Sequence, residues 1–500
     1  MKILVLQMAR LGDIYLSWPT LRALKRNFPQ AQVHVLVRPR FAGALEGLEV
    51  VSHVWTFPSQ QLAEKLLAEG GGLDEAKMQL RSFINQLRGQ NFHQVINLSF
   101  SPLSSFLTHS LESEGVNVRG YTRHEDGFLH LPDDASSYFY AQVGVGKINR
   151  LHLRELLAEV AGVQLKAEDM RAPPELIQPQ TVLRAVEETP MPPQDPYVIV
   201  QMGASQSEKQ YPQAAWLKVL SNLEQRWDGQ ILLVGTAEES LGAALVSQGL
   251  ERVHNWCGRS SLAQLISLVQ GADLVLGGDS LLMHIASLTE TRCLNLSSGQ
   301  VVNFWETGPL TLGSRILLDR ELSDIEPGRV VDETLALLQG EPPQGLVMER
   351  VSTSEGLTYR PSQGEELGPD FTWSLVQAIY LGQSWPILED HRLFIMLQRL
   401  NELCDLALSQ LEQVAKQSGP SLSSDLLTRI EEMISQMALI DSRIQPLVAW
   451  VQTEQVRLGP GSLNQVVEGS RKIYRNLKLV LSKYVPDTSS FEKSPSPYAE

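Results

Sequence analysis

Short apolar strands alternate with helical segments in this chain, and the alternation begins twice. The first run has a strand, a helix and a strand, at Lys2–Gln7, near Ser17–Asn27 and at Gln32–Val37. A strand at Tyr197–Gln201 begins the second run. Strands joined by crossover helices form an open parallel sheet, and such sheets bind ligands beyond the carboxyl ends of their strands. We therefore predict two doubly wound α/β domains with a ligand-binding cleft between them.

The spacing of apolar residues changes after residue 370. Apolar residues then recur at steps of three and four, in runs that begin at Leu393, Leu426 and Leu463. This spacing predicts three amphipathic helices that pack as a small all-α bundle, with Pro446 kinking or ending the second helix. An apolar stripe of this kind is usually internal core. The alternative is that the bundle self-associates or binds a protein partner.

Composition sets the boundaries between these parts. A charged, proline-rich stretch at Glu187–Pro193 and a stretch rich in Gly, Pro, Ser and Glu at Gly340–Asp370 both suit linkers. The predicted parts are an N-terminal Rossmann-like domain at 1–180, a linker at 181–196, a second Rossmann-like domain at 197–340, a linker at 341–370, the helical bundle at 371–485 and a disordered tail at 486–500.

Charge and composition exclude several classes of protein. The formal net charge of -15 argues against a nucleic-acid binder, which needs a basic surface. No apolar stretch is close to the length of about 20 residues that a bilayer-spanning helix needs, so we expect a cytoplasmic protein. The basic excess in residues 1–40 allows weak contact with the inner face of an anionic membrane. The cysteines are too scattered for a disulfide framework or a zinc site, at Cys257, Cys293 and Cys404.

A Gly-Asp pair follows the first strand of the chain. Gly12 allows a tight turn and close approach of the backbone to a ligand, and Asp13 lies at the carboxyl end of the strand. A carboxylate in that place is able to take a proton from an attacking hydroxyl. The alternative is that Asp13 only caps the following helix.

The turn after the strand Tyr197–Gln201 carries small, hydroxylated residues and a lysine. Ser205 provides hydrogen-bond donors and Lys209 a positive charge, both suited to phosphate oxygens. The segment lacks the Gly-Lys-Ser/Thr of a P-loop. A plain surface loop with an idle lysine is an equal alternative.

A third segment opens a helix after the strand Leu274–Leu276. Amides at a helix start hold phosphate through hydrogen bonds and the helix dipole, and Ser280 adds a hydroxyl there. His284 lies one turn further along the helix. The alternatives are that Asp279 is an ordinary N-cap and that His284 is a core histidine with satisfied hydrogen bonds.

Taken in order, these segments resemble the family of the ADP-heptose:lipopolysaccharide heptosyltransferases, glycosyltransferase family 9. The resemblance covers residues 1–340. It rests on Arg-Leu-Gly-Asp-Ile within Met1–Pro29, on Lys209 with Tyr211-Pro212, on Gly235-Thr236-Ala237-Glu238, on Cys257-Gly258-Arg259-Ser260-Ser261-Leu262, and on Gly278-Asp279-Ser280 with Met283-His284.

The resemblance implies a GT-B fold and an inverting glycosyltransferase that needs no cofactor and no metal ion. The N-terminal domain would hold a lipopolysaccharide-like or other cell-envelope glycan acceptor. The second domain would hold the nucleotide diphosphate sugar, for example ADP-heptose. Asp13 would be the general base. The implied donor-binding residues are Gly12, Ser205, Lys209, Glu238, Asp279, Ser280, Leu281 and His284.

The chain also departs from the family pattern. Leu281 replaces a glycine, which puts a side chain where the backbone usually meets the diphosphate, and the helical bundle lies outside the resemblance. These departures motivate an alternative function, a catalytically impaired GT-B protein that acts as an interaction scaffold through its helices.

Overall fold

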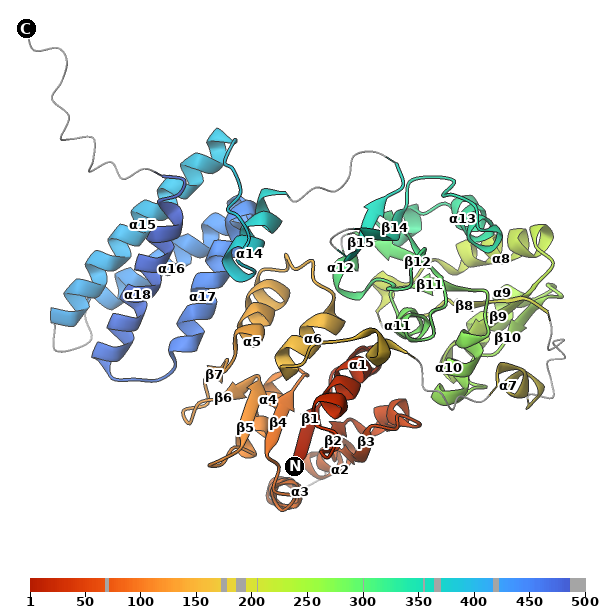
Figure 1. Cartoon of the computed structure of the whole chain (residues 1–500), viewed down its shortest axis with the longest axis horizontal. Coiled ribbons are helices and arrows are strands. Elements are labelled where there is room, and N and C mark those ends of the chain that lie inside the picture. The colour runs from red at the N-terminus through yellow and green to blue at the C-terminus, as the bar shows by residue number, and fades with distance from the viewer. Residues whose placement is uncertain are drawn as a thin grey trace, which may run out of the picture. The chain divides into compact units, whose positions relative to one another are not determined.

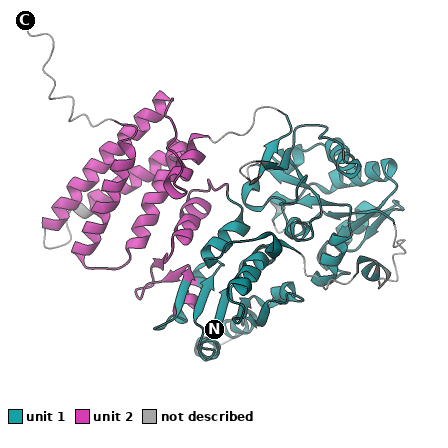
Figure 2. Ribbon diagram, in the orientation of Figure 1, with its two compact units in different colours: residues 1–104, 110–118, 151–368 teal, residues 105–109, 119–150, 369–500 magenta. Residues whose placement is uncertain are grey.

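The computed structural model describes residues 1–67, 72–171, 178–185, 195–204, 206–299, 301–353, 356–363, 370–416 and 422–485. Contacts divide the chain into two compact units (Figure 2). The α/β unit comprises residues 1–104, 110–118 and 151–368, and the helical unit comprises residues 105–109, 119–150 and 369–500. The predicted tail 486–500, and residues 186–194 of the predicted first linker, lie outside the described residues. The predicted domain bounds stay a prediction.

The first parallel sheet has the strand order β3-β2-β1-β4-β5 (Figure 1). Strand β1 pairs in parallel with β2 and with β4, so the order reverses between β1 and β4. The bounds are β1 Lys2–Leu6, α1 Leu11–Asn27, β2 Gln32–Val37, β3 Val51–Thr56, α2 Ser59–Leu66, α3 Leu73–Arg88, β4 Gln94–Asn97, α4 Pro102–Ser110, β5 Asn117–Gly120, α6 Leu153–Ala161 and α7 Pro179–Ala185.

The second sheet has the order β10-β9-β8-β11-β12-β13-β14-β15. Strand β8 pairs in parallel with β9 and β11, so this order reverses between β8 and β11. The bounds are β8 Tyr197–Gln201, α8 Gln213–Arg226, β9 Gln230–Val234, α9 Ser240–Ser247, β10 Val253–Asn255, α10 Leu262–Gln270, β11 Leu274–Gly278, α11 Leu281–Leu288, β12 Cys293–Ser298, α12 Phe304–Thr307, β13 Arg315–Asp319, α13 Pro327–Gln339, β14 Met348–Thr353 and β15 Gly356–Pro361. Two parallel sheets with helical crossovers confirm the predicted α/β class.

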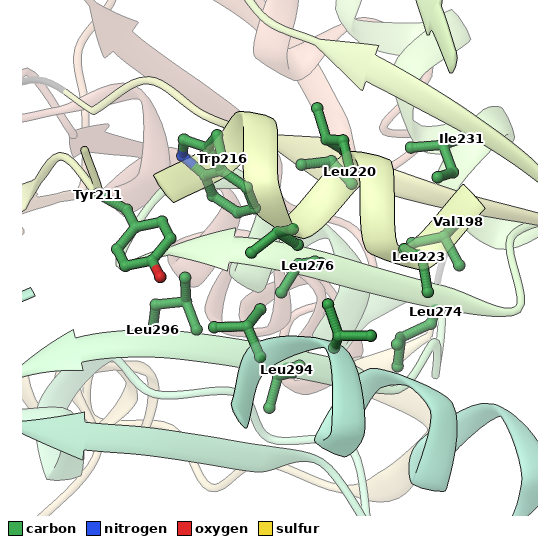
Figure 3. Packing of buried hydrophobic residues seen from close by; sticks show 14 of the residues in the cluster. Val198, Tyr211, Trp216, Leu220, Leu223, Ile231, Leu274, Leu276, Leu294 and Leu296 are labelled. Atoms are coloured by element: carbon green, nitrogen blue, oxygen red, sulfur yellow. The ribbon is translucent and has the colours of Figure 1, made fainter. Parts of the chain in front are cut away.

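Helix α8 covers one face of the second sheet with large side chains. Trp216 is 1% exposed and meets the ring of Tyr211 edge to face, with the ring centroids 5.2 Å apart. Figure 3 shows Leu220 and Leu223 of the same helix among side chains of the strands. Each such side chain contributes about 1.5–3 kcal/mol through burial, which holds the turns after β8 and β11 on a rigid base.

The predicted linker 341–370 contains a β-hairpin, which corrects that expectation. Strands β14 and β15 pair antiparallel, and β14 also pairs with β13. The start of the segment is held by Glu333, whose Oε1 accepts the amides of Gln344 and Gly345 at 2.7 and 2.8 Å. Its Oε2 accepts from Arg315, and both side chains of that ion pair are buried. The segment therefore has a composition typical of a linker, yet it forms two strands that long-range contacts stabilise.

The helical unit contains more helices than the three that the apolar spacing predicts. Its described helices in the C-terminal part are α14 Phe371–Tyr380, α15 His391–Lys416, α16 Leu422–Ile440, α17 Gln445–Leu458 and α18 Leu463–Leu481. Pro446 lies in the first turn of α17, where a missing amide leaves no hydrogen bond unmade. The second predicted helix thus ends before Pro446, as expected, but a further helix begins there.

Residues from the middle of the chain join this unit. They form β6 Thr122–Arg123, β7 Leu129–His130, α5 Asp134–Tyr138 and a π-helical segment at Phe139–Val145. The rings of Tyr138 and Tyr380 meet edge to face at 5.2 Å, and Arg457 pairs with Asp134 at 2.9 Å. None of the described helices is long and apolar enough to span a bilayer.

Candidate active site

The candidate residues follow the strands at which the sheet orders reverse. Asp13 comes after β1, Lys209 after β8 and Asp279 after β11. Such reversal points are where open α/β sheets bind ligands. The α/β unit contains all three residues, and their charges act on one another: Asp279 raises the pKa of Asp13, whereas Lys209 lowers it.

Asp13 lies in the first turn of α1, which begins at Leu11 and not near Ser17 as predicted. The helix continues through Pro19, and the Ser17 hydroxyl donates to the carbonyls of Asp13 and Ile14 at 3.0 and 2.8 Å. Oδ2 of Asp13 accepts the Arg10 amide at 2.9 Å. The capping role considered as an alternative is therefore present, but it occupies only one carboxylate oxygen.

Burial is the main influence on the Asp13 carboxyl. It raises the pKa of Asp13, and the Arg10 amide and the Arg10 charge oppose that rise. A carboxylate whose charged form is disfavoured binds a proton more readily than an exposed one. The environment thus suits a group that accepts a proton at neutral pH.

Gly12 lets α1 pack directly on α11. A Cβ atom at Gly12 would lie 2.9 Å from Cδ2 of His284, too close without movement of the imidazole, and 4.0 Å from the Leu281 Cα. His284 is 8% exposed, and burial lowers the pKa of His284 to about 4. The imidazole is therefore neutral at pH 7 and forms part of the packed floor beside Asp13.

Lys209 and Asp279 form a nearly buried ion pair. The Lys209 Nζ lies 2.7 Å from Asp279 Oδ2, and the two side chains are 12% and 10% exposed. The other oxygen, Oδ1, accepts from the Thr307 hydroxyl at 2.7 Å. Both oxygens of Asp279 are occupied, so this carboxylate orients the lysine.

The start of α11 offers donors for an anion. Ser280 is the N-cap, but its side chain makes no capping hydrogen bond; its hydroxyl donates to Oε1 of Gln201 at 2.8 Å. Leu281 is the first helical residue and its side chain is partly exposed. The amide end of this helix therefore lies beside Lys209's partner Asp279, in a geometry that suits phosphate.

The structure places Glu239, rather than the predicted Glu238, against the strand ends. Glu239 Oε2 accepts the amide and hydroxyl of Thr236 at 2.6 and 2.9 Å, whereas the side chain of Glu238 is exposed. A Cβ at Gly203 would lie 1.3 Å from Glu239 Oε1, so the Glu239 carboxylate lies directly against the Gly203 backbone and would have to move for a larger residue. The capping-box spacing from Thr236 to Glu239 was a signal in the sequence for this position. Ser205 lies outside the described residues.

The end of β4 lies next to the Asp13 turn. The Ser99 hydroxyl accepts the Met8 amide at 2.7 Å and donates to the Leu6 carbonyl at 3.1 Å, which ties β4 to β1. Phe100 follows with a φ of 47°, a backbone conformation that is strained for a bulky residue. Such strain is typical of functional loops, and this turn follows the carboxyl end of β4.

No group of three or more His, Cys, Asp or Glu side chains suited to a metal ion occurs among the residues that the structure describes.

Comparisons with known proteins give a consistent family. Residues 80–298 match the model of glycosyltransferase family 9 (heptosyltransferase). A curated relative, lipopolysaccharide heptosyltransferase 3 of Escherichia coli, is 22% identical over 354 residues, which span 66% of this chain and 96% of the relative.

Solved structures are similar over the same part of the chain. A family 9 glycosyl transferase from Veillonella parvula has a TM-score of 0.51 at 14% identity, with 68% of this chain and 97% of that chain covered. The E. coli heptosyltransferase WaaC with ADP has a TM-score of 0.48 at 16% identity, with 67% and 100% covered. The fold shared with the Veillonella parvula protein agrees with the predicted GT-B architecture. The resemblance that the motifs predict is confirmed as well: the chain is similar to the heptosyltransferases of glycosyltransferase family 9.

Proposed function

We propose that this protein is an inverting glycosyltransferase that moves a sugar from a nucleotide diphosphate to a hydroxyl of a lipopolysaccharide-like glycan. The observation that carries the proposal is the meeting of Asp13 with the Lys209–Asp279 pair at the two sheet reversal points. The family match supports glycosyltransferase activity. The name of the E. coli relative supports heptose as the sugar and a lipopolysaccharide acceptor.

In this mechanism Asp13 accepts the proton of the acceptor hydroxyl. The hydroxyl oxygen forms a bond to the anomeric carbon while the bond to the diphosphate breaks, and attack from the opposite face inverts the anomeric centre. Oδ2 of Asp13 keeps the Arg10 amide at 2.9 Å, so the other oxygen is the one that takes the proton. A general base of this kind contributes about 10²–10⁴ in rate.

Negative charge grows on the departing diphosphate, and fixed donors stabilise it. We assign this role to the Lys209 Nζ and to the amide end of α11, where Ser280 is the N-cap. Asp279 is a positioning residue, because the Lys209 ammonium and the Thr307 hydroxyl occupy its two oxygens. With these donors the reaction proceeds without a metal ion.

The exposed Glu238 and the inward-facing Glu239 suggest a change in the predicted donor site. We assign the nucleoside contact to Glu239, because its carboxylate lies against Gly203 at the end of β8. We assign the acceptor contact to residues 97–102, at the carboxyl end of β4. We place the reaction in the cytoplasm, with weak contact between the basic N-terminal residues and the membrane that carries the glycan.

Calorimetric titration with ADP tests the proposal. The full chain should bind ADP equally well with and without EDTA, and Lys209→Ala should weaken binding about 10–100-fold, because a charged hydrogen bond to phosphate is lost. The matched control is Lys218→Ala, an exposed lysine on α8. UDP and GDP serve as comparison nucleotides.

Absence of binding to every nucleotide diphosphate would favour the second candidate function, a scaffold. Two observations motivate that function. Leu281 stands at the helix start in place of the family's glycine, and the helical unit exposes large apolar side chains, Ile387 at 82%, Leu439 at 77%, Ile440 at 76% and Leu479 at 70%. A scaffold would keep its partners after Lys209→Ala, whereas a transferase would lose its donor.

A further inference from the structure

Two largely buried arginines of the α/β unit share a single, half-exposed carboxylate, Glu155. Arg350 on β14 is 6% exposed, and the Arg154 side chain at the start of α6 is 12% exposed. The Nε atoms of both are buried and have no hydrogen-bond partner. Among the described residues, Glu155 pairs with Arg154 at 3.8 Å, and the Glu155 side chain is half exposed.

The groups around these arginines do not neutralise them. The Arg350 guanidinium stacks over Tyr359 at 4.8 Å from the ring centre, and the Tyr359 hydroxyl donates to the Pro309 carbonyl at 2.7 Å. Burial raises the pKa of Tyr359, so this phenol stays neutral. Burial lowers the pKa of Arg154, Glu155 opposes that shift, and the Arg350 charge adds to it. The two sides of the cluster meet at adjacent residues, because His152 lies against the Gly308 carbonyl and Tyr359 donates to the Pro309 carbonyl.

A histidine and a helix end complete the cluster. His152 caps α6 by accepting the Arg154 amide at 3.2 Å on Nδ1, and its Nε2 lies 3.2 Å from the Gly308 carbonyl. Burial and the two arginines lower the pKa of His152, so the ring is neutral. Arg154 lies in the first turn of α6, at the positive end of the helix dipole, and a dipole of this sign favours an anion.

We propose that Arg154 and Arg350 form a second anion-binding site, which holds a phosphate group between α6 and the β14–β15 hairpin. Two buried cations that share one half-exposed carboxylate are costly, and an anion with several oxygens removes that cost through forked hydrogen bonds. The site uses none of the residues assigned to the donor. Its occupant is either free phosphate or a phosphate group on the glycan acceptor, and the second assignment rests on the proposed transferase function.

Phosphate titration of the full chain in low-chloride buffer tests the site. The wild-type protein should bind inorganic phosphate in the presence of saturating ADP, and both Arg350→Gln and Arg154→Gln should weaken that binding at least tenfold. Arg360→Gln, an exposed arginine on β15, is the matched control and should bind as the wild type does. Arg350→Lys keeps the charge but loses the fork, and should restore only part of the affinity.

A thermal readout separates binding from a purely structural role. Phosphate should raise the melting temperature of the wild-type protein and not that of Arg350→Gln. Without phosphate, Arg350→Gln should melt no lower than the wild type, because it removes an unpaired buried charge. A lower melting temperature, unchanged phosphate affinity in both variants, or displacement of phosphate by ADP would overturn the proposal.

Two further comparisons assign the occupant and isolate the inference. Glucose 6-phosphate binding more tightly than inorganic phosphate would assign the site to a phosphorylated glycan, and equal affinity would assign it to free phosphate. If ADP binding is lost in Lys209→Ala but phosphate affinity is unchanged in Arg350→Gln, this inference is overturned and the proposed function stays intact. ADP binding that is unchanged in Lys209→Ala, together with phosphate binding that is lost in Arg350→Gln, would overturn the proposed function and leave this inference intact.

Discussion

The turn after β1 and the turn after β11 each contain an aspartate, but the two carboxylates are held differently. Asp279 has both oxygens occupied, by a lysine and by a threonine at 2.7 Å each. Asp13 has the Arg10 amide on one oxygen, and the part of the chain that the structure describes places no donor on the other. A saturated carboxylate fixes its neighbours in place. A carboxylate with an open oxygen in a buried position is ready to take a proton.

The largest expected effect follows from the open oxygen. Asp13→Ala should lower the rate of sugar transfer about 10³-fold, because the general base is lost. ADP affinity should change by less than about twofold, since the lost group does not face the diphosphate. Single-turnover transfer from ADP-heptose, beside calorimetry with ADP, measures both. Full transfer activity in this variant would show that the two carboxylates do not differ in the way proposed.

His284 packs against Gly12 beside Asp13, and the charges of Asp279 and Lys209 act on its imidazole. Its folded pKa of about 4 lies below the ordinary 6.5, so its contribution to stability is complete above pH 6.5 and is lost as the pH falls toward 4. The loss amounts to up to about 3 kcal/mol of unfolding free energy. Urea denaturation between pH 4 and 7 should show a shallower pH dependence in His284→Gln.

The matched control for that experiment is His391→Gln, because His391 is exposed on α15. It should keep the pH dependence of the wild type. Equal slopes for all three proteins would mean that the His284 ring is not held neutral by its surroundings.

The saturated carboxylate should behave as a structural group. Asp279→Asn leaves the nearly buried Lys209 without its partner, and should lower the unfolding free energy by about 1–3 kcal/mol at pH 7. Thr307→Val removes only a neutral donor and should cost about 1 kcal/mol. Urea denaturation followed by circular dichroism measures both variants. A larger loss for the threonine variant would reverse the assignment of the main partner.

The smallest effect is opposite in sign. Burial raises the folded pKa of Asp13, so its charged form opposes folding at pH 7, and Asp13→Asn should slightly raise the melting temperature. The gain should vanish below pH 3.8, where Asp13 is protonated in both the folded and the unfolded chain. Differential scanning calorimetry at pH 7 and at pH 3 gives the comparison. Destabilisation at pH 7 would indicate that capping of α1 is the main role of this carboxylate.

The sequence predicts the central strands well, because a buried parallel strand is a short continuous apolar run. Gln32–Val37 and Tyr197–Gln201 have the predicted bounds. The positions of Asp13, Lys209 and Asp279 were also predictable, since strand ends at a reversal point are set by the order of elements. The motif located the turn at Gly235 and pointed to Glu238. Which of the two adjacent glutamates faces inward depends on the capping contact with Thr236, and the structure gives that contact to Glu239.

Other features depend on contacts between distant parts of the chain. The hairpin forms because Glu333 and β13 hold a segment whose composition resembles a linker. Arg154 and Arg350 belong to elements almost 200 positions apart in the sequence, and no local spacing of residues predicts the cluster that they form. Propensity and periodicity describe single elements, so neither feature was open to prediction from them.

The hairpin also limits where the chain can be truncated without exposing a sheet edge. Strand β14 covers the outer edge of β13, and β15 ends the sheet with Arg360 and Pro361, a charge and a proline that discourage further pairing. A chain cut at residue 340 would expose the bare edge of β13, and uncovered edges recruit strands from other molecules. Fragments that end after Pro361 should therefore stay monodisperse, while those that end at residue 340 should aggregate.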